Sequence, residues 1–241
     1  MKKDIFIFQN TSNDLNNNDN NENNNEAVDN VNEIGMPSIP DISKNIQFIT
    51  IIGEIEGHNV LPSGKKATKY EHIIPMLIAA KQDPKVEGIL IILNTAGGDV
   101  EAGLALSEMI NSIDKPKVSL ILGGGHSIGV PLATAADYSF IVPTAAMTIH
   151  PIRTTGLVIG VPQTYRYFEK MQKRITSFIL RTSKIKEDKL KNLMYATDEM
   201  ANDVGTILIG EEAVDCGLID EVGGFSDALK KLYELIDEKK N

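Results

Sequence analysis

The stretch EGILIILNTAGGDVEAGLALSEMINSIDKPKVSLILGGGHSIG, residues 87–129, decides the fold of this chain. It opens on a mostly apolar run, 87–93, that has the length of one buried strand and ends before two consecutive glycines. Residues 100–113 then place apolar side chains at helical spacing, and a second apolar strand follows at 117–122. A strand, a helix and a strand in this order predict parallel strands joined by a helical crossover.

The same alternation continues on both sides of this stretch. Further strands are expected at 46–55, 138–142, 146–150, 206–209 and 218–222, and further helices at 69–82, 130–136, 211–216 and 226–238. The chain is therefore expected to be an α/β protein built around one core.

Residues 155–181 interrupt this succession with a different pattern. A glycine-containing β-type stretch, 155–161, precedes a helix whose apolar residues recur at three- and four-residue spacing. These residues are Phe168, Met171, Ile175, Phe178 and Ile179. Such a stripe requires a partner surface.

The N-terminal part of the chain has a composition of its own. Between Asn10 and Asn32, twelve of 23 residues are Asn, and this segment holds too few apolar residues to offset the entropy lost on ordering. We expect residues 1–44 to form a disordered extension and linker, and residues 45–241 to form the folded domain.

Composition and charge exclude several classes of function. The chain of 241 residues has a formal charge of −9, and residues 10–33 alone hold six acids and no base, so the remainder is at −3. Without a basic cluster, nucleic acid is not expected as a partner. The sequence has a single cysteine, Cys216, and no secretory pattern, so we expect a cytoplasmic protein. Its apolar runs are too short for a membrane span. No cofactor or metal motif is found.

A serine lies in the glycine-rich turn that follows the second apolar strand, residues 123–129. In such a strand-to-helix turn Ser127 is held exposed, its small neighbours admit a substrate backbone, and the helix N-terminus favours developing negative charge. The turn therefore predicts a nucleophile. The alternatives are a turn that serves chain geometry alone, or one that holds a phosphate.

Two further features complete a candidate site. Gly97 and Gly98 follow a buried strand, where backbone N–H groups of glycines can form an oxyanion hole, although a glycine pair before a helix is also common punctuation. His150 ends the strand 146–150, from which an imidazole can reach a serine at the end of an adjacent strand and act as general base.

The other histidines are weaker candidates for the base. His58 and His72 precede the serine turn, and His126 adjoins Ser127 in the chain and is expected to point elsewhere. An α/β-hydrolase requires serine, acid and then a late histidine, and no histidine follows His150. The acid of this site is therefore expected after His150.

These residues resemble a known family, the proteolytic subunit of Clp protease, over about residues 46–222. The similarity is carried by Gly97-Gly98, by Ser127 in its glycine-rich turn, by MTIHP at 147–151 and by EEAVDCGLID at 211–220. With ANDVGT at 201–206, the chain is most similar to the translocation-enhancing protein branch of that class.

The resemblance implies a ClpP/crotonase-like fold of stacked ββα units with a protruding strand-helix handle at about 155–197. It also implies homo-oligomeric rings that face each other through the handle helices, and a peptide or unfolded protein as substrate. An ATPase partner is typical of the family. The residues before Ile46 do not resemble the family segment that contacts an unfoldase, so this partner does not carry over directly.

Carried over by position, Ser127 is the nucleophile, His150 the general base, and the N–H groups of Gly98 and Ile128 the oxyanion hole. The acid departs from the family pattern. Counting back without gaps places the family aspartate on Ala201, which cannot orient an imidazole. We favour Asp203, which precedes the strand at 206–209, over Asp198, which is expected inside a helical stretch.

The sequence thus predicts a serine endopeptidase that cleaves peptides or unfolded segments, with a link to protein translocation or quality control. Two other functions remain open at this point. A crotonase-type acyl-CoA enzyme would share the fold but needs acid and base carboxylates at the acyl site. A ring-forming binding protein with weakened catalysis would fit the displaced aspartate.

Overall fold

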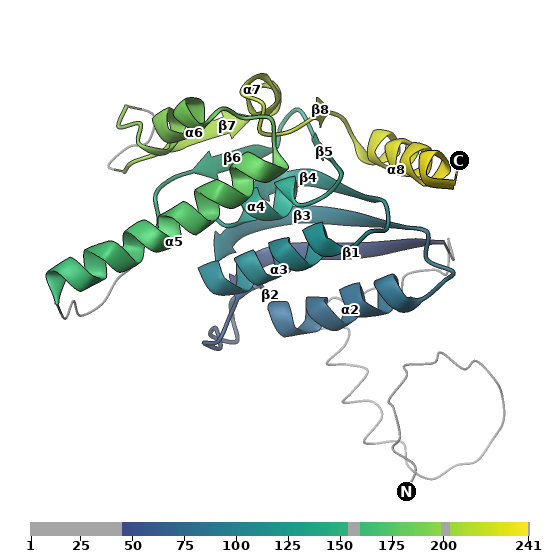
Figure 1. Ribbon diagram of the computed structural model, residues 1–241, viewed down its shortest axis with the longest axis horizontal. Coiled ribbons are helices and arrows are strands. Elements are labelled where there is room, and N and C mark those ends of the chain that lie inside the picture. Colours follow the sequence, from purple (N-terminus) through teal and green to yellow (C-terminus); the bar gives the residue numbers. More distant parts are fainter. Residues whose placement is uncertain (1–44, 154–159, 199–202, 241) are drawn as a thin grey trace, which may run out of the picture. The chain divides into compact units, whose positions relative to one another are not determined.

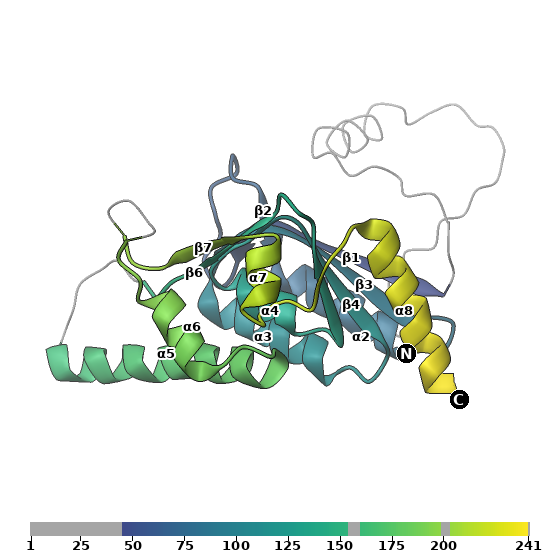
Figure 2. The same ribbon diagram turned by 90° about the horizontal axis from the view of Figure 1, so that it is seen from above.

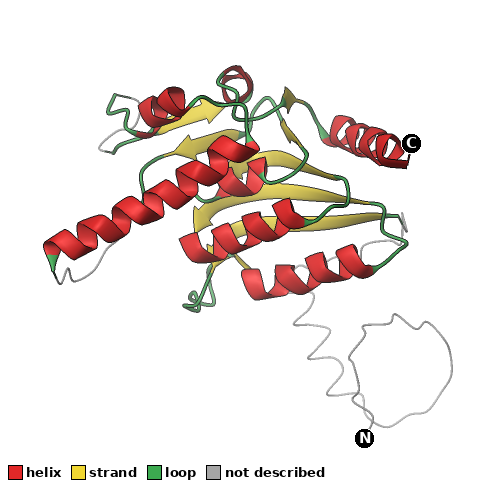
Figure 3. Cartoon of the chain, viewed as in Figure 1, coloured by secondary structure: helices red, strands yellow, loops and turns green. Residues whose placement is uncertain are grey.

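The computed structural model describes residues 45–153, 160–198 and 203–240 (Figures 1 and 3). The strands are β1 (Ile46–Glu56), β2 (Ala67–Lys69), β3 (Gly88–Gly98), β4 (Lys117–Gly125), β5 (Tyr138–Ile141), β6 (Ala146–Ile149), β7 (Thr206–Ile209) and β8 (Glu221–Val222). The helices are α2 (Tyr70–Gln82), α3 (Val100–Ser112), α4 (Gly129–Thr134), α5 (Val161–Thr182), α6 (Glu187–Met194), α7 (Glu211–Asp215) and α8 (Phe225–Lys240).

The strands form one sheet whose central part is parallel, in the order β2-β1-β3-β4-β5-β8. At the end of β4, Gly124 pairs with Ala146 of β6, and β6 pairs antiparallel with β7. Parallel neighbours end at the same edge of a sheet, so the glycine-rich ends of β3 and β4 meet, with Thr95 opposite Gly125. The two turns that sequence analysis selected are therefore neighbours.

Both faces of the central strands are covered, which explains why their sequences read as continuous apolar runs. On β3, Ile89 and Ile91 are buried in a core shared with α2 and α3, whereas Leu90 is buried with Leu232 and Ile236 of α8. Figure 2 shows α2, α3 and α4 along one side of the strands. The sheet is thereby held between helices, and its carboxyl edge is left to form the site.

Helix α5 is the handle helix, and its two halves differ. It extends past the sheet (Figure 1), and in its first half Val161 and Tyr165 are 71% and 68% exposed. Met171, near its middle, is buried, and in its second half Phe178 and Ile179 are buried in the core of the same chain. The apolar stripe thus finds much of its partner surface within the chain rather than on another subunit.

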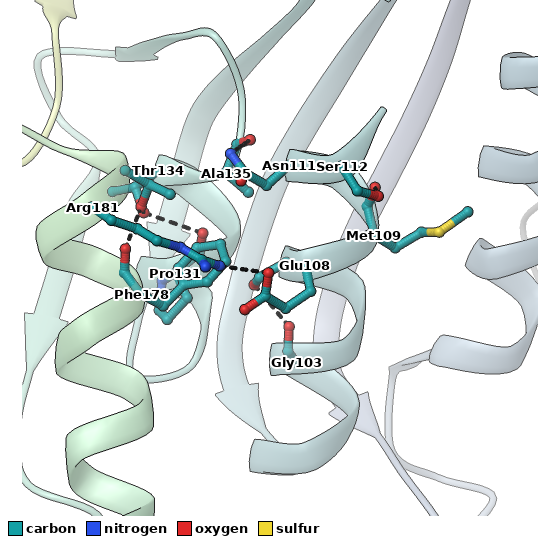
Figure 4. A network of polar contacts seen from close by, with 12 residues as sticks. Gly103, Glu108, Met109, Asn111, Ser112, Pro131, Thr134, Ala135, Phe178 and Arg181 are labelled. Atoms are coloured by element: carbon teal, nitrogen blue, oxygen red, sulfur yellow. Dashed lines mark hydrogen bonds and ion pairs between the residues drawn. The ribbon is translucent and has the colours of Figure 1, made fainter. Parts of the chain in front are cut away.

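Polar contacts hold the C-terminal end of α5 against α3 and α4 (Figure 4). Thr182 of α5 shares a hydrogen bond of 2.8 Å with Thr134 at the end of α4, and Arg181 forms an ion pair with Glu108 of α3. Asn111 of α3 also donates to the carbonyl of Ala135, which follows α4. The base of the handle, the helix after the serine turn and the helix after the glycine pair are therefore linked.

Most of the predicted elements are confirmed, and the differences have simple causes. The strand predicted at 218–222 is wrong in its first part, because only Glu221–Val222 pair with β5. Strand β2 was not predicted, since three residues carry no detectable alternation. The expected extension 1–44 and most of the β-type stretch 155–161 lie outside the described residues, and Val161 already belongs to α5.

Candidate active site

Ser127 occupies the turn between β4 and α4 with a φ of +56°, the one positive value among the described non-glycine residues. A non-glycine residue in the left-handed region costs roughly 1–2 kcal/mol, so the surrounding contacts must hold it there. Its N–H donates to the carbonyl of Thr148 on β6 at 2.9 Å, and its carbonyl accepts from Val130 of α4 at 3.0 Å. Ser127 is half-buried, and its strained backbone is of the kind that a nucleophile elbow has.

The glycine pair that ends β3 lies directly against this elbow. A Cβ added to Gly97, whose φ is +88°, would lie 2.7 Å from the Cβ of Ser127. A Cβ on Gly98 would lie 2.3 Å from the carbonyl oxygen of Ile55 on β1. Only glycine fits at either position, and the serine turn approaches the β3 backbone closely for that reason.

His126, next to the serine, ties the elbow to the strand that carries His150. Its Nδ1 lies 2.7 Å from Oγ1 of Thr148, and its own N–H donates to the carbonyl of Thr95 at 3.1 Å. Burial lowers the pKa of His126. The expectation that its side chain points away from the candidate site fits these contacts, because it binds β6 rather than lining the cleft beside Ser127.

His150 follows β6 and presents a defined tautomer. Its Nδ1 lies 2.6 Å from the carbonyl oxygen of Pro151, and a carbonyl can only accept, so Nδ1 carries the proton. In the neutral imidazole Nε2 then keeps its lone pair and is the basic atom. Burial lowers the pKa of His150, the Pro151 carbonyl raises it, the Arg153 cation lowers it and the Asp203 carboxylate raises it. A neutral imidazole near pH 7 is the form that a general base requires.

Ser127 and His150 line one cleft of about 170 Å³ at the carboxyl edge of the sheet. The other residues that line it are Gly98, Val100, Ile128, Val130, Ile149, Ile152, Arg153, Ile175, Ile179 and Met194. Backbone of the glycine pair and of the serine turn thus borders a pocket whose walls are aliphatic. Ile175, one residue of the apolar stripe of α5, therefore lines the cleft of its own chain.

The two acid candidates differ in their surroundings. A Cβ on Gly205 would be 2.8 Å from the Cβ of His150, so the turn that carries Asp203 runs close to the backbone of His150. Asp203 itself forms an ion pair of 2.8 Å with Arg153. Asp198 is exposed in a bend after α6, so the helical position expected for it is wrong. Ala201 lies outside the described residues.

Serine, imidazole and carboxylate are thus neighbours without forming a continuous chain of hydrogen bonds. In the described part of the chain, Ser127 and His150 share no hydrogen bond, and the Nδ1 partner of His150 is a carbonyl rather than Asp203. Catalytic hydrogen bonds are often long or misaligned without substrate, so this geometry is compatible with a serine hydrolase.

Sequence reasoning missed three residues that shape the site. Thr95 is buried, donates to the carbonyl of Gly53 at 2.7 Å and accepts from Gly97 at 3.0 Å, which fixes the glycine pair. Thr148 accepts from the N–H of Ser127 through its carbonyl and shares a second hydrogen bond with His126 through its hydroxyl, and Arg153 brings a cation to the cleft. A threonine inside a strand and an arginine after one carry no local signal, because their role depends on what the fold brings beside them.

Within the described ranges, no three His, Cys, Asp or Glu side chains gather in a way that would hold a metal ion. The helices of the same ranges include none with the length and apolar character needed to cross a membrane.

Comparison with known proteins identifies the family. The Clp protease family model matches residues 44–225, which include both turns, β6 and the turn of Asp203. The chain belongs to the Clp protease family. The match begins before β1 and ends at the start of α8, so it spans the sheet and the whole candidate site.

Two relatives are similar to the chain in sequence, and one solved structure is similar to it in fold. The translocation-enhancing protein TepA of Halalkalibacterium halodurans is 56% identical over 213 residues, 88% of this chain and 83% of that protein. The ATP-dependent Clp protease proteolytic subunit of Leuconostoc citreum is 32% identical over 94 residues, 38% of this chain and 46% of that protein. A ClpP1 mutant from Listeria monocytogenes is similar in structure, with a TM-score of 0.59, 22% identity, and 76% of this chain and 94% of that chain covered. The ClpP-like α/β fold expected from the sequence is confirmed.

Proposed function

We propose that this Clp protease family member is a serine endopeptidase that cleaves peptides or unfolded protein segments. The observation that carries the proposal is the shared cleft of Ser127 and His150, bordered by the backbone of Gly98 and Ile128. The strained turn places Ser127 at the cleft, and the protonated Nδ1 leaves Nε2 as the base. These are the parts that acyl transfer through an activated serine requires.

In the proposed reaction, Oγ of Ser127 bonds to the scissile carbonyl carbon while Nε2 of His150 takes the hydroxyl proton. The N–H groups of Gly98 and Ile128 stabilise the oxyanion of the tetrahedral intermediate. The C–N bond then breaks, and the amine leaves with the proton from His150. Water repeats the sequence on the acyl-enzyme, so the products are an amine and a carboxylic acid, and the serine is restored.

The walls of the cleft indicate the kind of residue that is bound beside the scissile bond. Val100, Val130 and Ile179 make the pocket aliphatic, so we propose an uncharged apolar side chain at this position. The similarity to TepA supports a role connected with protein translocation. We further propose a cytoplasmic, ring-forming protein that assembles through the exposed first half of α5, where Val161, Tyr165 and Tyr167 lie.

One observation favours a second candidate, a ring-forming binding protein with weak catalysis. Asp203 is paired with Arg153 and not with His150, so no carboxylate accepts a hydrogen bond from the imidazole in this arrangement. A crotonase-type acyl-CoA enzyme is less favoured, because no carboxylate is among the described residues that line the cleft.

The test is covalent labelling with a fluorophosphonate probe, combined with hydrolysis of fluorogenic peptides that carry an apolar residue before the scissile bond. We expect the wild type to be labelled and active and Ser127→Ala to lose both properties. Ser112→Ala is the matched control, since Ser112 is exposed and donates to the carbonyl of Met109 on α3 (Figure 4). Equal labelling of wild type and Ser127→Ala would reject Ser127, and a wild type without labelling or peptidase activity would favour the binding protein.

A further inference from the structure

Arg153 is the one charged side chain among the described residues that line the cleft. It lies three residues after His150, and its guanidinium is 2.8 Å from the carboxylate of Asp203. The remaining lining residues, from β3, α3, α4, α5 and α6, are uncharged. The fields that act on the imidazole therefore come from two groups, the Arg153 cation and the Asp203 anion.

Both oxygens of the Asp203 carboxylate are engaged away from His150. One accepts from the N–H of Val204 at 2.7 Å, and the other contacts Arg153. The turn of Asp203 nevertheless runs close to His150, because a Cβ on Gly205 would lie 2.8 Å from the Cβ of His150. Nδ1 of His150 is held by the carbonyl of Pro151 at 2.6 Å. Acid and base are thus neighbours in the fold, and each is bonded to another group.

We propose that Arg153 is a positioning residue that competes with His150 for Asp203, so that the acid joins the imidazole only when the ion pair opens. The inference rests on the proposed function, since it assigns a control to the same site. With the ion pair closed, Asp203 holds the guanidinium at the cleft. With it open, Asp203 accepts from Nδ1 in place of the Pro151 carbonyl and stabilises the imidazolium that forms during acyl transfer.

The ion pair is weak enough for such an exchange. The side chains of Arg153 and Asp203 are 48% and 37% exposed, and pairs at this level of exposure are commonly stabilised by no more than about 1 kcal/mol. A bound peptide or a neighbouring subunit that contacts Arg153 is enough to shift the balance. The resting enzyme is then less active than the residues of its site allow.

The first experiment measures the rate of fluorophosphonate labelling across pH for full-length wild type and Arg153→Gln. We expect the variant to react roughly fivefold faster at its plateau, the factor that corresponds to about 1 kcal/mol. The pH midpoint should move upward, because a cation that favours the neutral imidazole is removed and an anion that favours the charged one is released. Arg153→Lys keeps the charge but pairs less well, so its rate should lie between the two.

The second experiment does not depend on activity. In the Ser127→Ala background, the His150 imidazole is titrated by NMR with and without Arg153→Gln, and again with Asp203→Asn added. We expect Arg153→Gln to raise the pKa of His150 and Asp203→Asn to reverse most of that rise. As a matched control, Arg174→Gln breaks a comparable pair with Glu101 and should produce neither the faster labelling nor the rise.

The outcomes separate the two proposals. If Arg153→Gln labels at the wild-type rate or more slowly with an unchanged midpoint, Arg153 has a structural role only and the competition is rejected. If Asp203→Asn leaves the titration of Arg153→Gln unchanged, Asp203 does not reach His150 and the competition is also rejected. If no variant that retains Ser127 is labelled but the titration behaves as expected, the proposed peptidase function fails and the competition stands.

Discussion

The turn of Ser127 and the turn of Asp203 border the same imidazole and are held in different ways. The serine turn is bound to β6 through two bonds to Thr148 and to α4 through its own carbonyl. The turn of Asp203 is held by a hydrogen bond from Gly205 to the carbonyl of Ala196, at 2.8 Å, and by the half-exposed ion pair to Arg153. The nucleophile is therefore fixed by the sheet, whereas the Asp203 carboxylate is held by an N–H of its own turn, that of Val204 at 2.7 Å, and by one half-exposed ion pair.

This difference indicates where regulation and variation enter such a site. A nucleophile elbow stores backbone strain and needs surroundings that impose its geometry. An acid that only orients and stabilises an imidazole tolerates a change of partner, provided that the tautomer is secured by another group. Here the Pro151 carbonyl secures it. We expect changes at the serine turn to act strongly and changes at the acid turn to act moderately.

The largest effect is expected from Gly97→Ala, which tests the rigid side of the comparison. The new Cβ would lie 2.7 Å from the Cβ of Ser127 and 2.8 Å from the carbonyl oxygen of His126, at a φ of +88°. Displacing a reacting group by about 1 Å costs on the order of 100-fold in rate, and we expect a loss of this size in fluorophosphonate labelling. Thermal unfolding should report a loss of about 1–3 kcal/mol.

The matched control for this variant is Gly64→Ala. No heavy atom lies within 4 Å of a Cβ added there, so labelling and stability should stay at the wild-type level. Wild-type labelling by Gly97→Ala would show that the elbow adapts, and the contrast between the two turns would then be lost.

The serine turn could be predicted well from the sequence, and the turn of Asp203 could be predicted only poorly. Apolar runs of strand length, the glycine pairs and the serine turn are local signals, and they predicted the strands that lead to Gly98, Ser127 and His150. Strand β3 extends through Gly98 and β4 through Gly125, further than predicted, whereas β6 ends at Ile149, one residue before His150. The juxtaposition of these residues follows from parallel strands ending at one edge, which the strand-helix-strand order already implies. Fold and cleft were therefore accessible from the residues.

The acid turn had no comparable signal. Counting along the chain gave Ala201, and Asp203 was favoured over Asp198 only because it precedes a predicted strand. The choice depends on which backbone packs against His150, and the approach of Gly205 to the Cβ of His150 is compatible with Asp203. The ion pair between Arg153 and Asp203 is equally invisible, since it joins the residues after β6 to those before β7.

A moderate effect is expected from Asp203→Asn, which tests the weakly held side. Where the acid alone fixes the tautomer, an Asp→Asn change lowers the rate about 10⁴-fold. Here Nδ1–H already donates to Pro151, so we expect a loss of about tenfold or less in labelling and peptide hydrolysis, the size of one ordinary net hydrogen bond. The control is Asp198→Asn, an exposed position in a bend that should behave as wild type. A loss confined to Asp198→Asn would move the acid to that residue, and a 10⁴-fold loss in Asp203→Asn would show that Pro151 does not set the tautomer.

The smallest effect concerns the pH dependence of the wild type. Burial is the largest influence on His150 and lowers its pKa, so the neutral, basic form persists below the ordinary imidazole value of about 6.5. The labelling rate should rise with pH, with a midpoint below that value. When the pH is lowered from 7.5 to about 6.5, the rate should therefore decrease less than twofold. Labelling of the wild type across pH 5–8, with Ser127→Ala subtracted at each point, measures this midpoint. A midpoint above 6.5 would mean that Asp203 already lies on His150 in the wild type, and that the two turns are coupled more tightly than their separate contacts indicate.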